Sequence, residues 1–119
     1  LFENNDLVDL NYLVEMTDGN HETISKIMEI FLDEVPANLL SLEKAITAMD
    51  YPSIKKIVHH LKSSVAVLGI NPLKSILQEM ELLAGSAFNL KRIVELNPSL
   101  QGLCKRAIAE IEQKIGDYQ

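Results

Sequence analysis

Long apolar runs, an excess of basic residues and a second cysteine are all missing from this chain of 119 residues. No apolar stretch approaches the roughly 20 residues that a membrane-spanning helix needs. Acidic residues outnumber basic ones by 17 to 11, and the formal net charge of −6 argues against nucleic-acid or anionic-membrane partners. Cys104 is the only cysteine, so we expect no internal disulfide, a buried thiol and a reducing compartment.

The opening stretch, LFENNDLVDL, also lacks the basic and then apolar layout of a secretory signal, so we expect a cytoplasmic protein. The chain does not begin with Met, which fits a piece of something longer. Its length, with 47% hydrophobic and 24% charged residues, predicts one folded domain spanning residues 1–119.

Apolar residues recur at helical spacing along the whole chain, whereas strand and hairpin signals are weak. Asp6 is expected to cap a first short helix, and Asn20 is expected to begin a second. Pro36 is expected to end the second helix and to open a third, because proline is tolerated in a first turn but not in a helix interior. Asp50 and Pro52 open the next helix in the same way.

Gly69 is placed to stop the helix that begins near Asp50, and Asn71 is expected to cap the following one. The last apolar pattern runs from Leu90 to Ile115, and we expect a kink or a restart at Pro98. Short loops between amphipathic helices imply antiparallel neighbours, so the fold class is all-α, an up-down bundle. The larger core side chains are expected to include Met28, Phe31, Met49 and Met80.

The stretch IVHHLKSSVAVLGI, residues 57–70, places two adjacent histidines in an apolar helical run. At about 100° per residue, His59 lies roughly 150° from the centre of the apolar stripe and faces water, whereas His60 lies roughly 110° away, at the flank of the core. The residues one turn before and after His59 are lysines or have short side chains, namely Lys55, Lys56, Lys62, Ser63 and, beyond them, Ala66.

An exposed imidazole among lysines can accept a phosphoryl group, because imidazole is nucleophilic near neutral pH and ammonium groups neutralise the incoming charge. On helix geometry alone, however, two surface histidines beside lysines are more often simply solvated. His21, in a first helical turn, is expected to be solvated in this sense.

The segment HHLKSSVAVLG resembles the signature of the histidine-containing phosphotransfer (HPt) domain, which reads roughly H-x-L-K-G-S-S-x-x-L-G. His59 falls on the phosphorylated histidine, Lys62 on the lysine, and Leu68 and Gly69 on the closing pair. The resemblance extends from about residue 7 to 115. It implies an antiparallel four-helix bundle with an additional short N-terminal helix, acting as a phosphoryl relay in multistep two-component signalling.

The resemblance also implies roles for individual residues. His59 is the phosphoacceptor, Lys62 neutralises the phosphoryl group, and Glu81 accepts a hydrogen bond from Nδ1 of His59, which leaves Nε2 to react. Ser63 stands where the family commonly has glycine, a small residue that lets a partner approach. We expect the partner to dock on Ser63, Ala66, Lys55 and Lys56.

The expected partners are the receiver domain of a response regulator, a hybrid sensor histidine kinase, or both. The receiver would supply Mg²⁺, and this domain would bind no cofactor or metal, have no kinase or phosphatase activity of its own, and be a monomer. One alternative is an HPt-type domain of a histidine kinase, phosphorylated by its ATP-binding domain; another is a non-catalytic helical adaptor. A metal-binding bundle is disfavoured, because adjacent histidines project about 100° apart and no Glu-x-x-His pair occurs.

Overall fold

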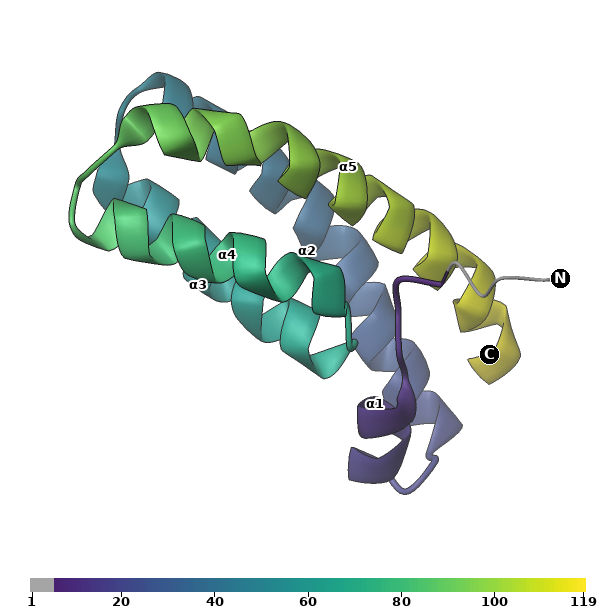
Figure 1. The fold of residues 1–119 in the computed structure, drawn as a ribbon. Coiled ribbons are helices and arrows are strands. Elements are labelled where there is room, and N and C mark those ends of the chain that lie inside the picture. Colours follow the sequence, from purple (N-terminus) through teal and green to yellow (C-terminus); the bar gives the residue numbers. More distant parts are fainter. Residues whose placement is uncertain (1–5) are drawn as a thin grey trace, which may run out of the picture.

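Four long helices and one short one make up the fold in a computed structural model that describes residues 6–119 (Figure 1). In chain order, they are α1 (Asn11–Met16), α2 (His21–Thr47), α3 (Tyr51–Val67), α4 (Asn71–Gly85) and α5 (Leu90–Lys114), followed by a 3₁₀ turn, η1 (Ile115–Tyr118). The long helices run alternately up and down, with α3 and α4 packed side by side and α2 and α5 on the other side of the bundle. This arrangement confirms the predicted fold class. Residues 1–5 of the predicted single domain lie outside the described residues.

Proline does not break either of the two longest helices. Pro36 lies inside α2, so the prediction that a new helix begins there is wrong. A proline in a helix interior loses one backbone hydrogen bond, but burial of the flanking apolar residues offsets that cost; here Val35 and Leu39 are both buried. Pro98 likewise lies inside α5, which continues to Lys114 without restarting.

Asparagine and aspartate side chains begin three of the long helices. Asn20, Asp50 and Asn89 each accept a hydrogen bond from the backbone N–H three residues further on. The fourth differs from the prediction: Asn71 is the first residue of α4, and Ile70 precedes it without a side-chain cap. Ile70 is instead fully buried, so packing rather than a polar cap fixes this helix start.

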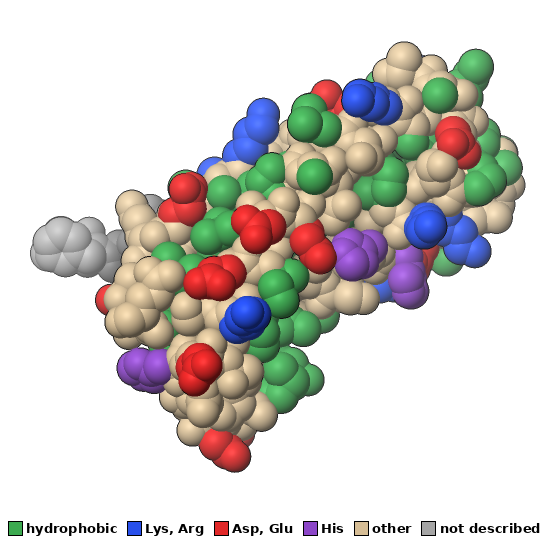
Figure 2. Space-filling model, turned by 180° about the vertical axis from the view of Figure 1, so that it is seen from behind, with side chains coloured by type: hydrophobic (Ala, Val, Ile, Leu, Met, Phe, Trp, Pro, Cys, Tyr) green, Lys and Arg blue, Asp and Glu red, His purple; other side chains and the backbone are tan. Residues whose placement is uncertain are grey.

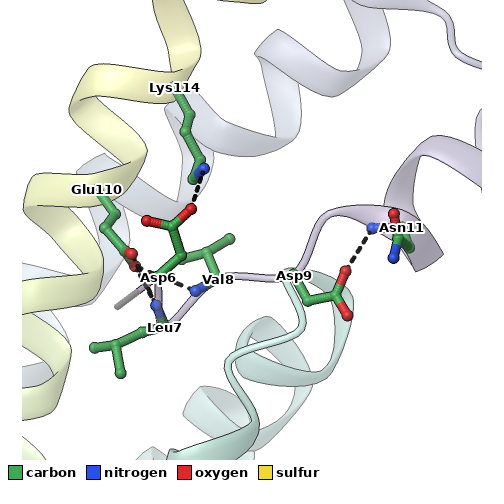
Figure 3. A network of polar contacts seen from close by, with 7 residues as sticks. All are labelled: Asp6, Leu7, Val8, Asp9, Asn11, Glu110 and Lys114. Carbon is green, nitrogen blue, oxygen red and sulfur yellow. Dashed lines mark hydrogen bonds and ion pairs between the residues drawn. The ribbon is translucent and has the colours of Figure 1, made fainter. Parts of the chain in front are cut away.

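The segment before α1 is held by side chains and backbone far away in the sequence (Figure 3). Both carboxylate oxygens of Glu110 accept the backbone N–H of Leu7, at 2.7 and 2.9 Å, and one of them also accepts that of Val8, at 3.1 Å. Asp6 pairs with Lys114 at 3.2 Å. The prediction that Asp6 caps a helix is therefore wrong, because its carboxylate is directed to α5 and α1 begins only at Asn11.

Left-handed residues end the helices α1, α2, α3 and α4. After α2, Met49 has φ +54°, its N–H donates to the carbonyl of Ile46, and the N–H of Asp50 donates to Ala45. This pair of bonds is the Schellman arrangement, with Met49 at its left-handed position. Met49 is 63% exposed, so its predicted place in the core is wrong. Met28, Phe31 and Met80 are buried as predicted.

One apolar core fills the bundle, and it fixes which face of α3 meets solvent. Ile54, Val58, Leu61 and Val65 are buried at the spacing of one helix face. Because residues on the opposite face must then point outward, the positions between them carry the exposed histidine and lysine side chains of this helix.

Candidate functional site

His59 lies on the outer face of α3, one residue after the buried Val58, and its side chain is 70% exposed. Its Nδ1 lies 2.6 Å from Oε2 of Glu81 on the neighbouring helix α4. The contact that was expected between these two atoms is therefore present. Figure 2 shows two histidine side chains next to each other on this face, with acidic side chains on one side of them and basic ones on the other.

Glu81 also contacts a second partner on α3. Its Oε1 accepts a hydrogen bond from Nζ of Lys62 at 2.9 Å, so each oxygen of the carboxylate has one partner. The hydrogen bond from Lys62, and after it the one from His59, lowers the pKa of Glu81 below its ordinary value. The Glu81 side chain is only 18% exposed, which leaves it little freedom to move away.

This geometry sets the proton position on the imidazole. An ionised carboxylate is only an acceptor, so Nδ1 of His59 must carry the hydrogen in the short contact with Glu81. In a neutral imidazole the other nitrogen then has the free lone pair. Nε2 is therefore the ring nitrogen of His59 that has an available lone pair.

His60 lies on the other side of α3 and contacts a different helix. Its Nε2 is 3.1 Å from Oε2 of Glu34 on α2, and the two side chains are 55% and 49% exposed. His60 was expected at the flank of the core, and at that position α2 presents the half-exposed carboxylate of Glu34. In His60 the nitrogen with a partner is Nε2, the opposite of His59.

Comparison with known protein families identifies the family of this chain. Residues 26–114 match the family model described as the Hpt domain, which is most of the chain. The chain belongs to the HPt family. Its function is therefore phosphotransfer in a multistep phosphorelay, as the sequence resemblance predicted, and the family as a whole carries phosphoryl groups rather than catalysing as an enzyme.

Individual relatives agree with this family assignment. Multistep phosphorelay regulator 1 of Schizosaccharomyces pombe is 27% identical over 85 residues, which are 68% of this chain and 29% of that protein. This HPt chain thus spans less than a third of that relative's length.

Two solved structures share the fold. The histidine-containing phosphotransfer protein B of Pseudomonas aeruginosa PAO1 superposes with a TM-score of 0.86 at 18% identity, covering 98% of this chain and 100% of that one. The HPT domain of a sensor hybrid histidine kinase from Shewanella superposes with a TM-score of 0.82 at 13% identity, covering 94% and 97%.

Two hollows flank His59 on the surface of the HPt domain. The first, the α3–α4 hollow, is lined by Lys55, His59, Glu81, Leu82, Gly85 and Ser86. The second, the α2–α3 hollow, is lined by Asn38, Ser41, Ser53, Lys56, Ile57, His59, His60 and Ser63. The two lysines that precede His59 are thus separated, one into each hollow.

The remaining predicted docking residues point to different parts of the surface. Ser63 is exposed and also lines an apolar hollow between α2 and α3, next to the exposed side chains of Met16 and Ile30. Ala66 is exposed and lines another hollow together with Tyr12 of α1, about two helical turns beyond His59. The docking role of Lys55, Lys56, Ser63 and Ala66 stays a prediction.

Sequence reasoning missed Glu34, Leu82, Met16 and Ile30 as neighbours of this surface. Glu34 and Met16 carry no such signal, because the packing of α1 and α2 against α3 decides whether they lie near it. Ile30 and Leu82 could have been found, since each is a large apolar residue off the buried stripe of its helix, with 47% and 67% exposure.

The surroundings of the remaining candidate residues, Cys104 and His21, indicate structural roles. Cys104 is buried, and desolvation raises its pKa to about 12. His21 is exposed and packs edge-to-face on Tyr118, with ring centres 5.0 Å apart. Among residues 6–119 no group of three or more His, Cys, Asp or Glu side chains is placed to hold a metal ion. No helix in that range is both long and apolar enough to cross a bilayer.

Proposed function

We propose that this HPt domain accepts a phosphoryl group on Nε2 of His59 and donates it again, exchanging it with the aspartate of a receiver domain. The observation that carries the proposal is the 2.6 Å contact between Nδ1 of the exposed His59 and Glu81. That contact fixes one nitrogen and leaves the other free to react. His60 lacks this arrangement, because its Nε2 already faces Glu34.

The transfer step follows from this placement. The lone pair of Nε2 attacks phosphorus, the bond from phosphorus to the aspartyl oxygen breaks, and its electron pair returns to the receiver's carboxylate. The imidazole then carries a positive charge, which the carboxylate of Glu81 at Nδ1 stabilises. In the reverse direction the same imidazolium is a good leaving group, so one geometry serves both acceptance and donation.

Lys62 contributes a positive charge close to this pair. Its ammonium group holds the second oxygen of Glu81, so it helps to keep the carboxylate ionised and in place. The predicted neutralisation of the phosphoryl group by Lys62 remains a proposal, and we propose that Lys62 acts through this carboxylate.

The partner supplies what this domain lacks. We propose that Mg²⁺ and the remaining catalytic groups belong to the receiver, that this domain binds no cofactor, and that alone it neither hydrolyses ATP nor phosphorylates itself. A receiver, a hybrid sensor histidine kinase, or both would be the partner of a cytoplasmic, monomeric domain. The name of the S. pombe relative, a phosphorelay regulator, supports partners of this class.

The test uses the two adjacent histidines as matched controls. Each single variant, His59→Gln and His60→Gln, is incubated with a phosphorylated receiver, and the acid-labile, base-stable label typical of phosphohistidine is followed. We expect no uptake by His59→Gln and continued uptake by His60→Gln. Both imidazoles are solvent-facing, so neither change should unfold the bundle. Label on His59→Gln together with none on His60→Gln would refute the proposal.

A further inference from the structure

The three lysines near His59 lie on two different sides of it. On α3, Lys56 and Ser63 are displaced by about 60° and about 40° from His59 toward α2, whereas Lys55 and Lys62 are displaced by about 40° and about 60° toward α4. The directions are set by observed contacts: Lys62 reaches Glu81 on α4, and His60, on the Lys56 side, reaches Glu34 on α2.

The imidazole of His59 lies between the α2 side and the α4 side of α3. Nδ1 is held on the α4 side by Glu81. The two ring nitrogens point in diverging directions, so anchoring Nδ1 at Glu81 on α4 turns Nε2 away from that carboxylate. Helical side chains also lean toward the N-terminus, so the ring of His59 lies over the turn that contains both Lys55 and Lys56.

The two hollows also differ in charge, and the difference favours the α2–α3 hollow for a phosphoryl group. The α3–α4 hollow contains the Glu81 carboxylate, which would repel a phosphoryl dianion. Among the described residues that line the α2–α3 hollow none is acidic, and Lys56 is its only cation apart from the histidines. Glu34 and Asp50 contact the lining residues His60 and Ser53, but neither carboxylate lines this hollow.

The wall of the α2–α3 hollow also has an unused hydrogen-bond donor. The side-chain nitrogen of Asn38 on α2 is shielded from solvent and has no hydrogen-bond partner among residues 6–119. Buried polar groups are nearly always paired, but this nitrogen is itself shielded, so an acceptor oxygen in the hollow would reach it only after the Asn38 side chain rotates. The hydroxyl of Ser63, on the α3 side, is a further donor lining the same space.

We propose that the phosphoryl group on Nε2 of His59 lies at the α2–α3 hollow and is met there by Lys56, while Lys62 acts on it only through Glu81. This inference rests on the proposed phosphorylation of His59, and it assigns to Lys56 a contact with the phosphoryl group rather than with the partner's surface. It also gives the three lysines distinct tasks: Lys56 binds the phosphoryl group, Lys62 positions Glu81, and Lys55 does neither.

The experiment loads the domain without a partner. Phosphoramidate transfers its phosphoryl group to histidine as its P–N bond breaks, ammonia leaves and a P–Nε2 bond forms. The ³¹P NMR signal of phosphorylated His59 is assigned by its absence from His59→Gln. Its titration is then followed in the wild type and in Lys56→Ala, Lys62→Ala and Lys55→Ala, three variants that each remove one exposed or half-exposed cation.

A nearby cation favours the dianionic phosphoryl group, so removing the cation in contact raises the midpoint of the titration. We expect Lys56→Ala to raise it by about half a pH unit, the size typical of losing one solvent-exposed charge partner. Lys62→Ala should leave this midpoint unchanged but should shift the ¹⁵N signal of His59 Nδ1 in the unphosphorylated protein, since it acts through Glu81. Lys55→Ala should change neither.

Other outcomes overturn the inference. A larger rise in Lys62→Ala or Lys55→Ala than in Lys56→Ala would place the phosphoryl group on the α4 side, and no rise in any variant would place it in open solvent. Failure of the proposed function is recognised separately: the titrations would behave as expected, yet no receiver would exchange label with the wild type. Labelling that persists in full on His59→Gln would refute both.

Discussion

Glu81 and Glu110 use the same chemistry for opposite purposes in two regions of this HPt domain. Each carboxylate engages both of its oxygens. Glu110, on α5, accepts backbone N–H groups of Leu7 and Val8 and so fixes the path of the chain before α1. Glu81, on α4, accepts side-chain donors of His59 and Lys62, whose positions the helices already determine.

The difference lies in what each contact holds in place. Without Glu110, the backbone N–H groups of Leu7 and Val8 lose their acceptor on α5. The N-terminal segment would then lose the contacts that hold it on the bundle. Without Glu81, both helices keep their core contacts, and only the orientation of an exposed imidazole changes. The first region should therefore govern stability with little effect on phosphotransfer, and the second should do the reverse.

The largest effect on stability is expected where the N-terminal segment crosses the end of α3. Gly69 has φ +61°, and a Cβ at this position would lie 2.0 Å from the backbone oxygen of Asp9. Gly69→Ala combines left-handed strain with a clash against backbone, so it should lower the free energy of unfolding by about 2–4 kcal/mol. Chemical denaturation measures this.

A glycine elsewhere supplies the control for that variant. Gly102 lies inside α5, and a Cβ there would meet nothing within 4 Å. Gly102→Ala should therefore stabilise the domain by up to about 1 kcal/mol, since alanine is the better helix former. Equal destabilisation by both variants would show that contact with the Asp9 backbone is not the cause.

A smaller loss of stability is expected from Glu110→Ala, which leaves the N–H groups of Leu7 and Val8 without their acceptor. Unsatisfied, partly buried donors cost about 1–3 kcal/mol, and phosphoryl uptake should be unchanged once the protein is folded. Glu112→Ala, on the exposed side of the same helix, should change the free energy of unfolding by no more than about 0.5 kcal/mol. A drop in the uptake rate of folded Glu110→Ala would break the comparison.

Glu81→Gln should reverse that pattern. The neutral amide no longer fixes the hydrogen on Nδ1 of His59 and no longer stabilises the phosphorylated imidazolium, so transfer should slow by about tenfold, the equivalent of one charge-assisted hydrogen bond. The midpoint of thermal unfolding should stay nearly constant. Stopped-flow transfer from a phosphorylated receiver is the measurement.

Glu34→Gln is the matched control, because Glu34 contacts the neighbouring imidazole of His60. It should leave the transfer rate unchanged. A comparable loss of rate in Glu34→Gln would mean that general surface charge, rather than the orientation of His59, explains the effect of Glu81.

The smallest expected effect is the pH dependence of stability. Hydrogen bonds from Lys62 and His59 lower the pKa of Glu81 in the folded state below the ordinary value of 4.5. The stability that this carboxylate contributes is thus present above pH 4.5 and is lost as the pH falls through the lowered pKa of the folded state. The difference in unfolding free energy between wild type and Glu81→Gln should shrink over that acidic range. A difference that stays constant on acidification would contradict this origin.

The sequence predicted best where periodicity and local chemistry agree. The apolar stripe of α3 placed Val58 and Leu61 in the core and therefore turned His59 outward. The start of α2 followed in the same way from the capping side chain of Asn20.

The failures have a common physical cause. Pro36 looked like a helix boundary because local chemistry disfavours an interior proline, but packing along α2 outweighs that cost. Asp6 looked like a cap, but its partner Lys114 is distant in the sequence. The contact between His60 and Glu34 was not predicted, because Glu34 reaches His60 only once α2 is packed against α3. The apolar periodicity of one helix does not predict which side chains of another helix it will contact.

The central claim is that Nε2 of His59 carries the phosphoryl group while Glu81 holds Nδ1. The most direct measurement is the ¹⁵N–³¹P coupling in histidine-labelled wild-type protein that has been phosphorylated by its receiver. The account predicts one phosphorylated histidine, with phosphorus coupled to Nε2 of His59 and with His60 unmodified. Coupling to Nδ1 of His59, or to either nitrogen of His60, would contradict it.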